Sequence, residues 1–252
     1  MEWGYSVSGF AVGILVGITG VGGGSLMTPL LVFLFGFKPS VAVGTDLLFA
    51  AITKTNGVWV HHTKHNSVNW QVVRWLAMGS LPASIVTLYI IQHMMEVGKE
   101  TTGIISYTLG VALLLTAASL LIRGVLLRRA KTIAHIDDKI STARNTGRFK
   151  KAQLPITVFT GVILGILVTL SSVGAGALGT VALLFLFPRM STLKVVGTDL
   201  AHAIPLTAVA GAGHWFLGNV DFVLLASLLI GSVPGIWIGS HISAKIPERF
   251  LR

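Results

Sequence analysis

The stretch GITGVGGGSLMTPLL, residues 17–31, decides the fold because glycines and a proline interrupt an otherwise apolar segment. Glycine inside a helix costs about 1 kcal/mol relative to alanine, and Pro29 removes a further backbone donor. The surrounding apolar segment, residues 5–36, is too short to cross a bilayer twice, since each crossing takes about 20 residues. We therefore predict two half-helices that enter the membrane and return, meeting at the glycine-rich tip GVGGGS (20–25).

The composition predicts a polytopic helical membrane protein. Of the 252 residues, 53% are hydrophobic and 11% are charged, and the mean hydropathy is +0.80. A soluble domain carries roughly 25% charged residues, whereas apolar stretches of membrane-spanning length recur along this chain. The absence of cysteine excludes disulfides, thiolate chemistry and metal sites built on cysteine.

The positive charge is concentrated in one stretch. The net charge is +10, and nine of the nineteen Lys and Arg residues lie between Arg123 and Lys151. A basic connector between membrane spans is expected on the cytoplasmic side. We interpret it as a topology signal that contacts anionic lipid headgroups, with a partner site as the alternative, and we expect no nucleic acid.

The chain contains an internal duplication. VGTDL at 43–47 returns at 196–200, and VGGGSLMT (21–28) matches VGAGALGT (173–180). We predict a first membrane repeat, a basic cytoplasmic linker and a second, incomplete membrane repeat, over residues 1–123, 124–152 and 153–252. The predicted spans are 5–36 (broken), 40–62, 70–92 and 103–123, then 154–187 (broken), 194–216 and 221–244. Span 103–123 has no second copy, so the last helix of the second repeat is expected to be absent, through truncation or divergence.

The charges also predict the direction of the repeats. With the basic linker in the cytoplasm, a re-entrant segment 154–187 keeps the later basic residues on the same side. Span 40–62 then runs inward and its copy 194–216 runs outward, and the N-terminus lies outside. Inverted repeats of this kind are typical of secondary transporters with a substrate site near the midplane.

The broken segments predict an anion site. A half-helix that starts at a glycine-rich tip has unpaired backbone N–H groups and about half a positive charge, which together bind anions. Nearby hydroxyls and the polar residues of the following span add hydrogen bonds. The candidate substrate-binding residues are Thr19, Gly22, Gly23, Gly24, Ser25, Thr45, Lys54, Asn56, Ser171, Ser172, Gly174, Gly176, Thr198 and His202. We expect no metal site and no cofactor.

Other glycines have a simpler interpretation. Gly9, Gly13 and Gly17 are spaced by four, as are Gly161 and Gly165. Small residues at this spacing let membrane helices pack closely. The contiguous glycines of the tip are not needed for packing, which favours a ligand-facing role for them.

Ionisable residues inside the spans are functional candidates by default. Lys54 is expected to contact the anion, to reach the interface with its long side chain, or to pair with an aspartate. Asp46 and Asp199 occupy equivalent places in the two repeats and are expected to cap a helix, to carry a coupling proton or to pair with Lys54. His202 is expected to donate to the substrate, to carry a proton, or to pack as a satisfied core histidine.

GVGGGSLMTPLL followed by AVGTDLLFAAITKTNGVWVHH, with a second VGTDL one repeat later, resembles the TauE/SafE family of sulfite exporters. The resemblance implies a multi-pass carrier of the inner membrane that exports sulfite or an organosulfonate. Alternatives are an anion channel or a carrier of another small carboxylate or oxyanion. No enzyme is expected, because GVGGGS lacks the Lys-Ser/Thr of a P-loop. The expected partners are a small anion and the lipid bilayer, and a homodimer stays open.

Overall fold

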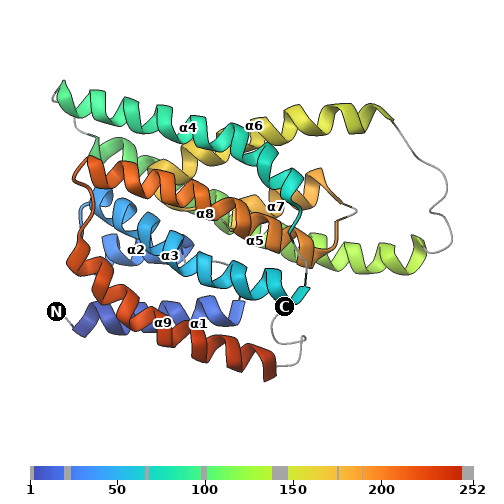
Figure 1. Cartoon of the computed structure of the whole chain (residues 1–252), viewed down its shortest axis with the longest axis horizontal. Helices are drawn as coiled ribbons and strands as arrows, with labels where there is room; N and C mark the ends of the chain where they lie inside the picture. The colour runs from blue at the N-terminus through green and yellow to red at the C-terminus, as the bar shows by residue number, and fades with distance from the viewer. Residues whose placement is uncertain are drawn as a thin grey trace.

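The computed structural model is all-helical over the residues that it describes (Figure 1). The helices are α1 (Trp3–Thr19), α2 (Gly24–Phe33), α3 (Pro39–His65), α4 (Trp70–Glu96), α5 (Thr102–Asp137), α6 (Gly147–Ser171), α7 (Ala177–Leu186), α8 (Thr192–Phe216) and α9 (Phe222–Lys245). The structure describes the backbone of residues 3–19, 24–65, 68–97, 101–137, 147–174, 176–188 and 190–245. Within these ranges it does not describe the side chains of residues 17–19, 24–25, 56–65, 123–137, 147–152, 192 and 240–245.

Both broken segments fold back on themselves, but α6 by itself is long and apolar enough to cross a bilayer, so the prediction of two half-helices is wrong for this helix. Where α2 has ended, the Phe35 ring lies 5.0 Å from the ring of Tyr5 in the first turns of α1. In the second half, the Gln153 amide near the start of α6 donates to the Leu186 carbonyl at the end of α7, at 3.4 Å. α1 with α2, and α6 with α7, are therefore two helical hairpins.

The longer helix of each hairpin packs along a helix of the other half. A Cβ added at Gly9 or Gly13 of α1 would lie 2.4 or 2.5 Å from a backbone carbonyl of α9. The equivalent glycines of α6, Gly161 and Gly165, approach carbonyls of α4 to 2.3 and 2.4 Å by the same measure. The packing interpretation of these four glycines is confirmed. Close backbone contact is the reason glycine is required there.

α3 and α8 pack against each other at the centre of the molecule. In Figure 1, α3 runs from left to right and its counterpart α8 from right to left. The opposite directions agree with inverted repeats, which stay a prediction. α5 packs against α3, α6 and α7.

The predicted linker, 124–152, differs from the expected loop. α5 continues to Asp137 and α6 begins at Gly147, so much of the basic stretch is helical. Its leucine, alanine, arginine and lysine residues are strong helix formers, and charge does not prevent a helix from extending beyond the membrane.

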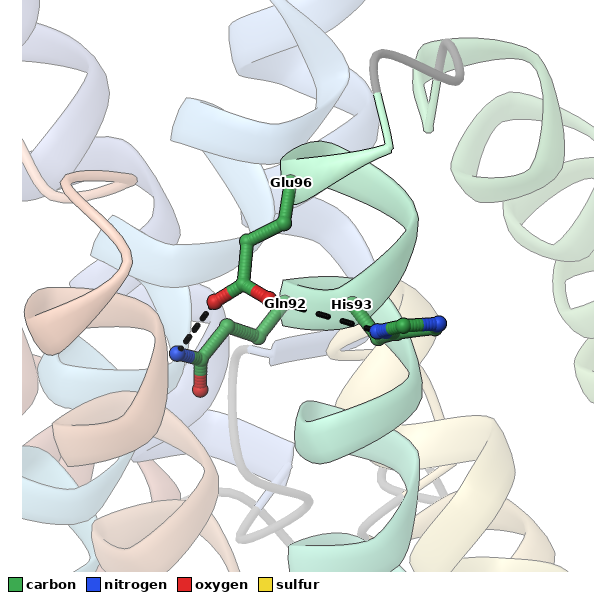
Figure 2. Close-up of polar contacts among 3 residues, drawn as sticks. All are labelled: Gln92, His93 and Glu96. Carbon is green, nitrogen blue, oxygen red and sulfur yellow. Dashed lines mark hydrogen bonds and ion pairs between the residues drawn. The ribbon is translucent and has the colours of Figure 1, made fainter.

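The outer surface fits a membrane. Within the described residues, five helices are long and apolar enough to cross a bilayer: α4, α5, α6, α8 and α9. Large apolar side chains such as Tyr107, Phe159 and Leu121 are exposed on them, as a lipid-facing surface requires. Figure 2 shows a polar cluster at the exposed end of α4, where Gln92 donates to Glu96 at 3.0 Å and His93 lies 4.0 Å from the same carboxylate. These exposed contacts contribute little to stability.

Candidate functional site

Four ionisable side chains are buried where α3 and α8 meet. Asp46 and Lys54 of α3 are 0% and 3% exposed, and Asp199 and His202 of α8 are each 2% exposed. Charged residues are almost never buried unless they are paired. Their burial at equivalent places in two packed helices makes this centre the candidate site.

Each aspartate is bonded to the half-helix that precedes its own helix. The Thr28 hydroxyl of α2 donates to Asp46 Oδ2 at 2.5 Å. The Thr180 hydroxyl of α7 lies 2.9 Å from Asp199 Oδ2 and 2.5 Å from the Gly176 carbonyl, and it shares its proton between these two acceptors. A carboxylate beside the first turn of a helix is also stabilised by the helix dipole. The aspartates therefore fasten α2 and α7 to the two central helices.

The capping alternative for these aspartates is wrong. α3 begins at Pro39 and α8 at Thr192, so Asp46 and Asp199 lie in helix interiors. The N-cap of α8 is Ser191, whose hydroxyl accepts from the Lys194 amide. The predicted spans 40–62 and 194–216 begin within two residues of the observed helices, so VGTDL lies inside each helix although its Gly-Thr-Asp resembles a start signal.

Lys54 points into the protein. Its side chain is 3% exposed, and its charge interacts with Asp199 and with Asp46. The alternative that Lys54 reaches out to the interface is wrong, because an interfacial ammonium would be exposed. A buried ammonium whose charge interacts with two carboxylates satisfies the need for paired charges.

The His202 ring is held by a residue that sequence reasoning missed. Ser80 Oγ of α4 lies 2.8 Å from His202 Nε2, and both residues are buried. If the serine donates, the other ring nitrogen, Nδ1, carries the proton and faces away as a donor. The available signal was the repetition of GSLPAS (79–84) as GSVPGI (231–236), which marks the Ser80 position in both halves.

The break between α6 and α7 presents backbone donors. Ser172 has φ +56°, and Gly174 and Gly176 have φ +116° and +139°, conformations that favour glycine. The amide N–H groups of Ala177 and Leu178 lie in the first turn of α7, where a helix offers its own N–H groups no acceptor. The Ala177 carbonyl is held by the Ser119 hydroxyl of α5, at 3.1 Å. α7 thus begins as a buried helix N-terminus.

Thr45 and Thr198 join the two halves. The Thr45 hydroxyl accepts from the amide of Asp221, the residue before α9, at 3.1 Å. The Thr198 hydroxyl accepts from the Asn69 amide at 2.9 Å, and Asn69 caps α4. Each threonine therefore supports a helix start in the other half, a structural role that the sequence did not predict.

The remaining predicted residues are placed as follows. Ser171 is buried and donates to the Leu167 carbonyl at 2.6 Å, so it closes the end of α6. Thr19, Gly24, Ser25 and Asn56 lie in helices, but their side chains are outside the described part of the chain, as are Gly22 and Gly23 entirely. Among the described residues, no group of three or more His, Asp or Glu side chains could hold a metal ion.

The buried centre therefore combines one ammonium, one imidazole and the N-terminus of α7 with two carboxylates that are already bonded. Such a set can bind a small anion through N–H and ammonium donors.

Comparison of the sequence with known proteins identifies its family. The sequence profile of the family described as Sulfite exporter TauE/SafE matches residues 5–252. The probable membrane transporter protein YjnA of Bacillus subtilis (strain 168) is 38% identical over 97% of this chain and 91% of its own length. Probable membrane transporter protein YdhB of the same organism is 26% identical over 96% and 91%. Probable membrane transporter protein MJ0441 of Methanocaldococcus jannaschii is 26% identical over 98% and 88%.

No solved structure matches the chain. The family profile covers nearly the whole sequence, including both hairpins, α3 and α8. The relatives are named as membrane transporters, in agreement with the apolar helices of the structure. The chain is a membrane transporter and belongs to the Sulfite exporter TauE/SafE family.

Proposed function

We propose that this protein is a secondary carrier that exports a small sulfur-containing anion, sulfite or an organosulfonate, across the inner membrane. The observation that supports the proposal is the start of α7, a buried helix N-terminus beside the buried Asp199 carboxylate. Helix N-termini bind oxyanions through N–H groups and the helix dipole. The family description names sulfite as the exported anion.

Lys54 and His202 complete the proposed site. The ammonium supplies a full positive charge in a region of low dielectric, where attraction to an anion is strong. His202, held at Nε2 by Ser80, supplies a directed donor. Asp46 and Asp199 keep the two half-helices in place through Thr28 and Thr180.

Transport by alternating access follows from the two hairpins. Inverted repeats with broken helices expose a midplane site first to one face and then to the other. The crossed contacts of Thr45 with Asp221 and of Thr198 with Asn69 would pass a movement of one half to the other. We place the N-terminus outside and the basic stretch in the cytoplasm, as the positive-inside rule indicates.

Counterflow of labelled sulfite in proteoliposomes tests the proposal. Wild type should show saturable exchange, and Lys54→Ala should lose it. Gly176→Ala should raise the KM, because φ +139° disfavours an L side chain and the start of α7 must move. Gly36→Ala is the matched control: Gly36 also has positive φ, at +69°, but lies in open space away from the centre.

Exchange retained in Lys54→Ala and Gly176→Ala would contradict the site. Exchange of thiosulfate or a sulfonate in place of sulfite would keep the carrier and change its substrate. Electrical conductance in place of saturable exchange would replace the carrier with a channel.

A further inference from the structure

The charges of the buried centre are close to balance before any substrate binds. With both aspartates ionised and Lys54 protonated, the buried side chains carry two negative charges and one positive charge. The described side chains of α2, α5, α7 and α9 are uncharged. The N-termini of α2 and α7 each add about half a positive charge. A transported anion therefore brings a negative charge that nothing described in this centre offsets.

Two buried oxygens in this centre have no hydrogen-bond partner. They are Asp46 Oδ1 and Ser172 Oγ, whose residues are 0% and 2% exposed. Ser172 lies close enough to the Asp46 carboxylate to interact with it, although without the geometry of a full hydrogen bond, and the other carboxylate oxygen accepts from Thr28. Buried polar atoms almost always have a hydrogen-bond partner. Two neighbouring oxygens that lack one indicate a site where a ligand binds.

We propose that a monovalent cation, a proton or Na⁺, binds between Asp46 and Ser172 and travels with the anion. A proton on Asp46 Oδ1 would donate to Ser172 Oγ, and Na⁺ would take both oxygens as ligands. Either cation adds the positive charge that the anion requires. The inference rests on the proposed function and adds to it the coupling ion and its site.

The site joins the two halves of the protein. Asp46 lies on α3, whereas Ser172 lies at the break between α6 and α7, where the anion donors begin. A bound cation would therefore link the substrate tip of one half to the central helix of the other. The position that corresponds to Ser172 in the first repeat is Gly20, which has no hydroxyl to pair with Asp199. The cation site is accordingly assigned to Asp46 alone.

The transport experiment uses proteoliposomes with labelled sulfite and two separate driving gradients. One arm imposes a pH gradient without Na⁺, and the other imposes a Na⁺ gradient at equal pH. One of these should drive concentrative uptake in wild type. Ser172→Ala should raise the cation concentration for half-maximal uptake about tenfold, which corresponds to the loss of one polar contact to a charge. Asp46→Asn should abolish the response to either gradient.

Ser232→Ala is the matched control, because Ser232 also carries a buried hydroxyl without a partner but lies on α9. It should respond to the gradient as wild type does. Indifference of wild type to both gradients, or an unchanged response in Ser172→Ala, would overturn the cation site. Gradient-free counterflow of wild type in the same preparation reports on the carrier itself, so the two failures are distinguishable.

A binding measurement tests the site even if sulfite is not carried. The melting temperature of the purified protein is recorded across pH, and across NaCl against choline chloride at constant ionic strength. A cation that binds only the folded state raises this temperature. Wild type and Ser232→Ala should show the same cation-dependent rise, and Ser172→Ala a smaller one. Equal curves for all three proteins would refute the site.

Discussion

Lys54→Met isolates the electrostatics of the buried centre. Methionine keeps the length of the side chain and removes its charge, leaving Asp199 and Asp46 buried without their ammonium. Removing one partner of a buried charge pair costs about 3–5 kcal/mol, because the remaining charge loses its compensation. For a chain of this size each kcal/mol shifts the melting temperature by about 2–4 °C. We therefore expect Lys54→Met to melt roughly 6–20 °C below wild type.

A double variant shows whether the effect is electrostatic. Asp199→Asn in the Lys54→Met background removes one of the two uncompensated charges. The double variant should be less destabilised than the sum of the single ones, by about 1 kcal/mol or more. Thermal unfolding in detergent measures all three, with Lys194→Met as control because Lys194 is exposed at the start of α8. Additive effects, or a melting temperature of Lys54→Met equal to that of the control, would refute the reasoning.

Two further predictions concern packing and the aspartate contacts. Gly79→Ala should lower the melting temperature by the equivalent of about 1–3 kcal/mol, since its Cβ would lie 2.0 Å from a carbonyl oxygen of α6. Gly110→Ala is the control: a Cβ there meets open space, so the melting temperature should not change. Thr180→Val should cost about 1.5–3 kcal/mol and reduce counterflow, because Asp199 loses a charge-assisted hydrogen bond. Thr157→Val is its control, since that hydroxyl bonds only the carbonyl of its own helix, and an equal loss in both would contradict the role of Asp199.

The sequence alone predicted the membrane class and the helix order. Apolar runs of spanning length are a direct consequence of the bilayer thickness, so they can be read without a structure. The glycine break of residues 20–25 and its copy predicted the two hairpins, which the contacts of Tyr5 with Phe35 and of Gln153 with Leu186 confirm. The four-residue glycine spacing predicted close helix packing but not which helices would meet.

The tertiary structure determined which buried side chains form hydrogen bonds with one another. Thr28 and Asp46 are 18 positions apart in the chain, and Thr180 and Asp199 are 19 positions apart. No local sequence pattern links residues at this separation. Ser80 meets His202 across 122 positions of the chain. The capping interpretation of the aspartates was wrong because local sequence cannot tell a helix start from a helix interior at VGTDL.

Local propensity and the length of apolar segments determine which residues lie on a helix, and both can be read from the sequence. Which buried charge meets which hydroxyl depends on how whole helices pack across the two halves. Asp46 and Ser172 are neighbours only because α6 returns to the centre beside α3. The composition of the centre was therefore readable from the sequence, whereas its charge balance and its unpaired oxygens were decided by the fold, because only packing removes water from these groups and makes their pairing matter.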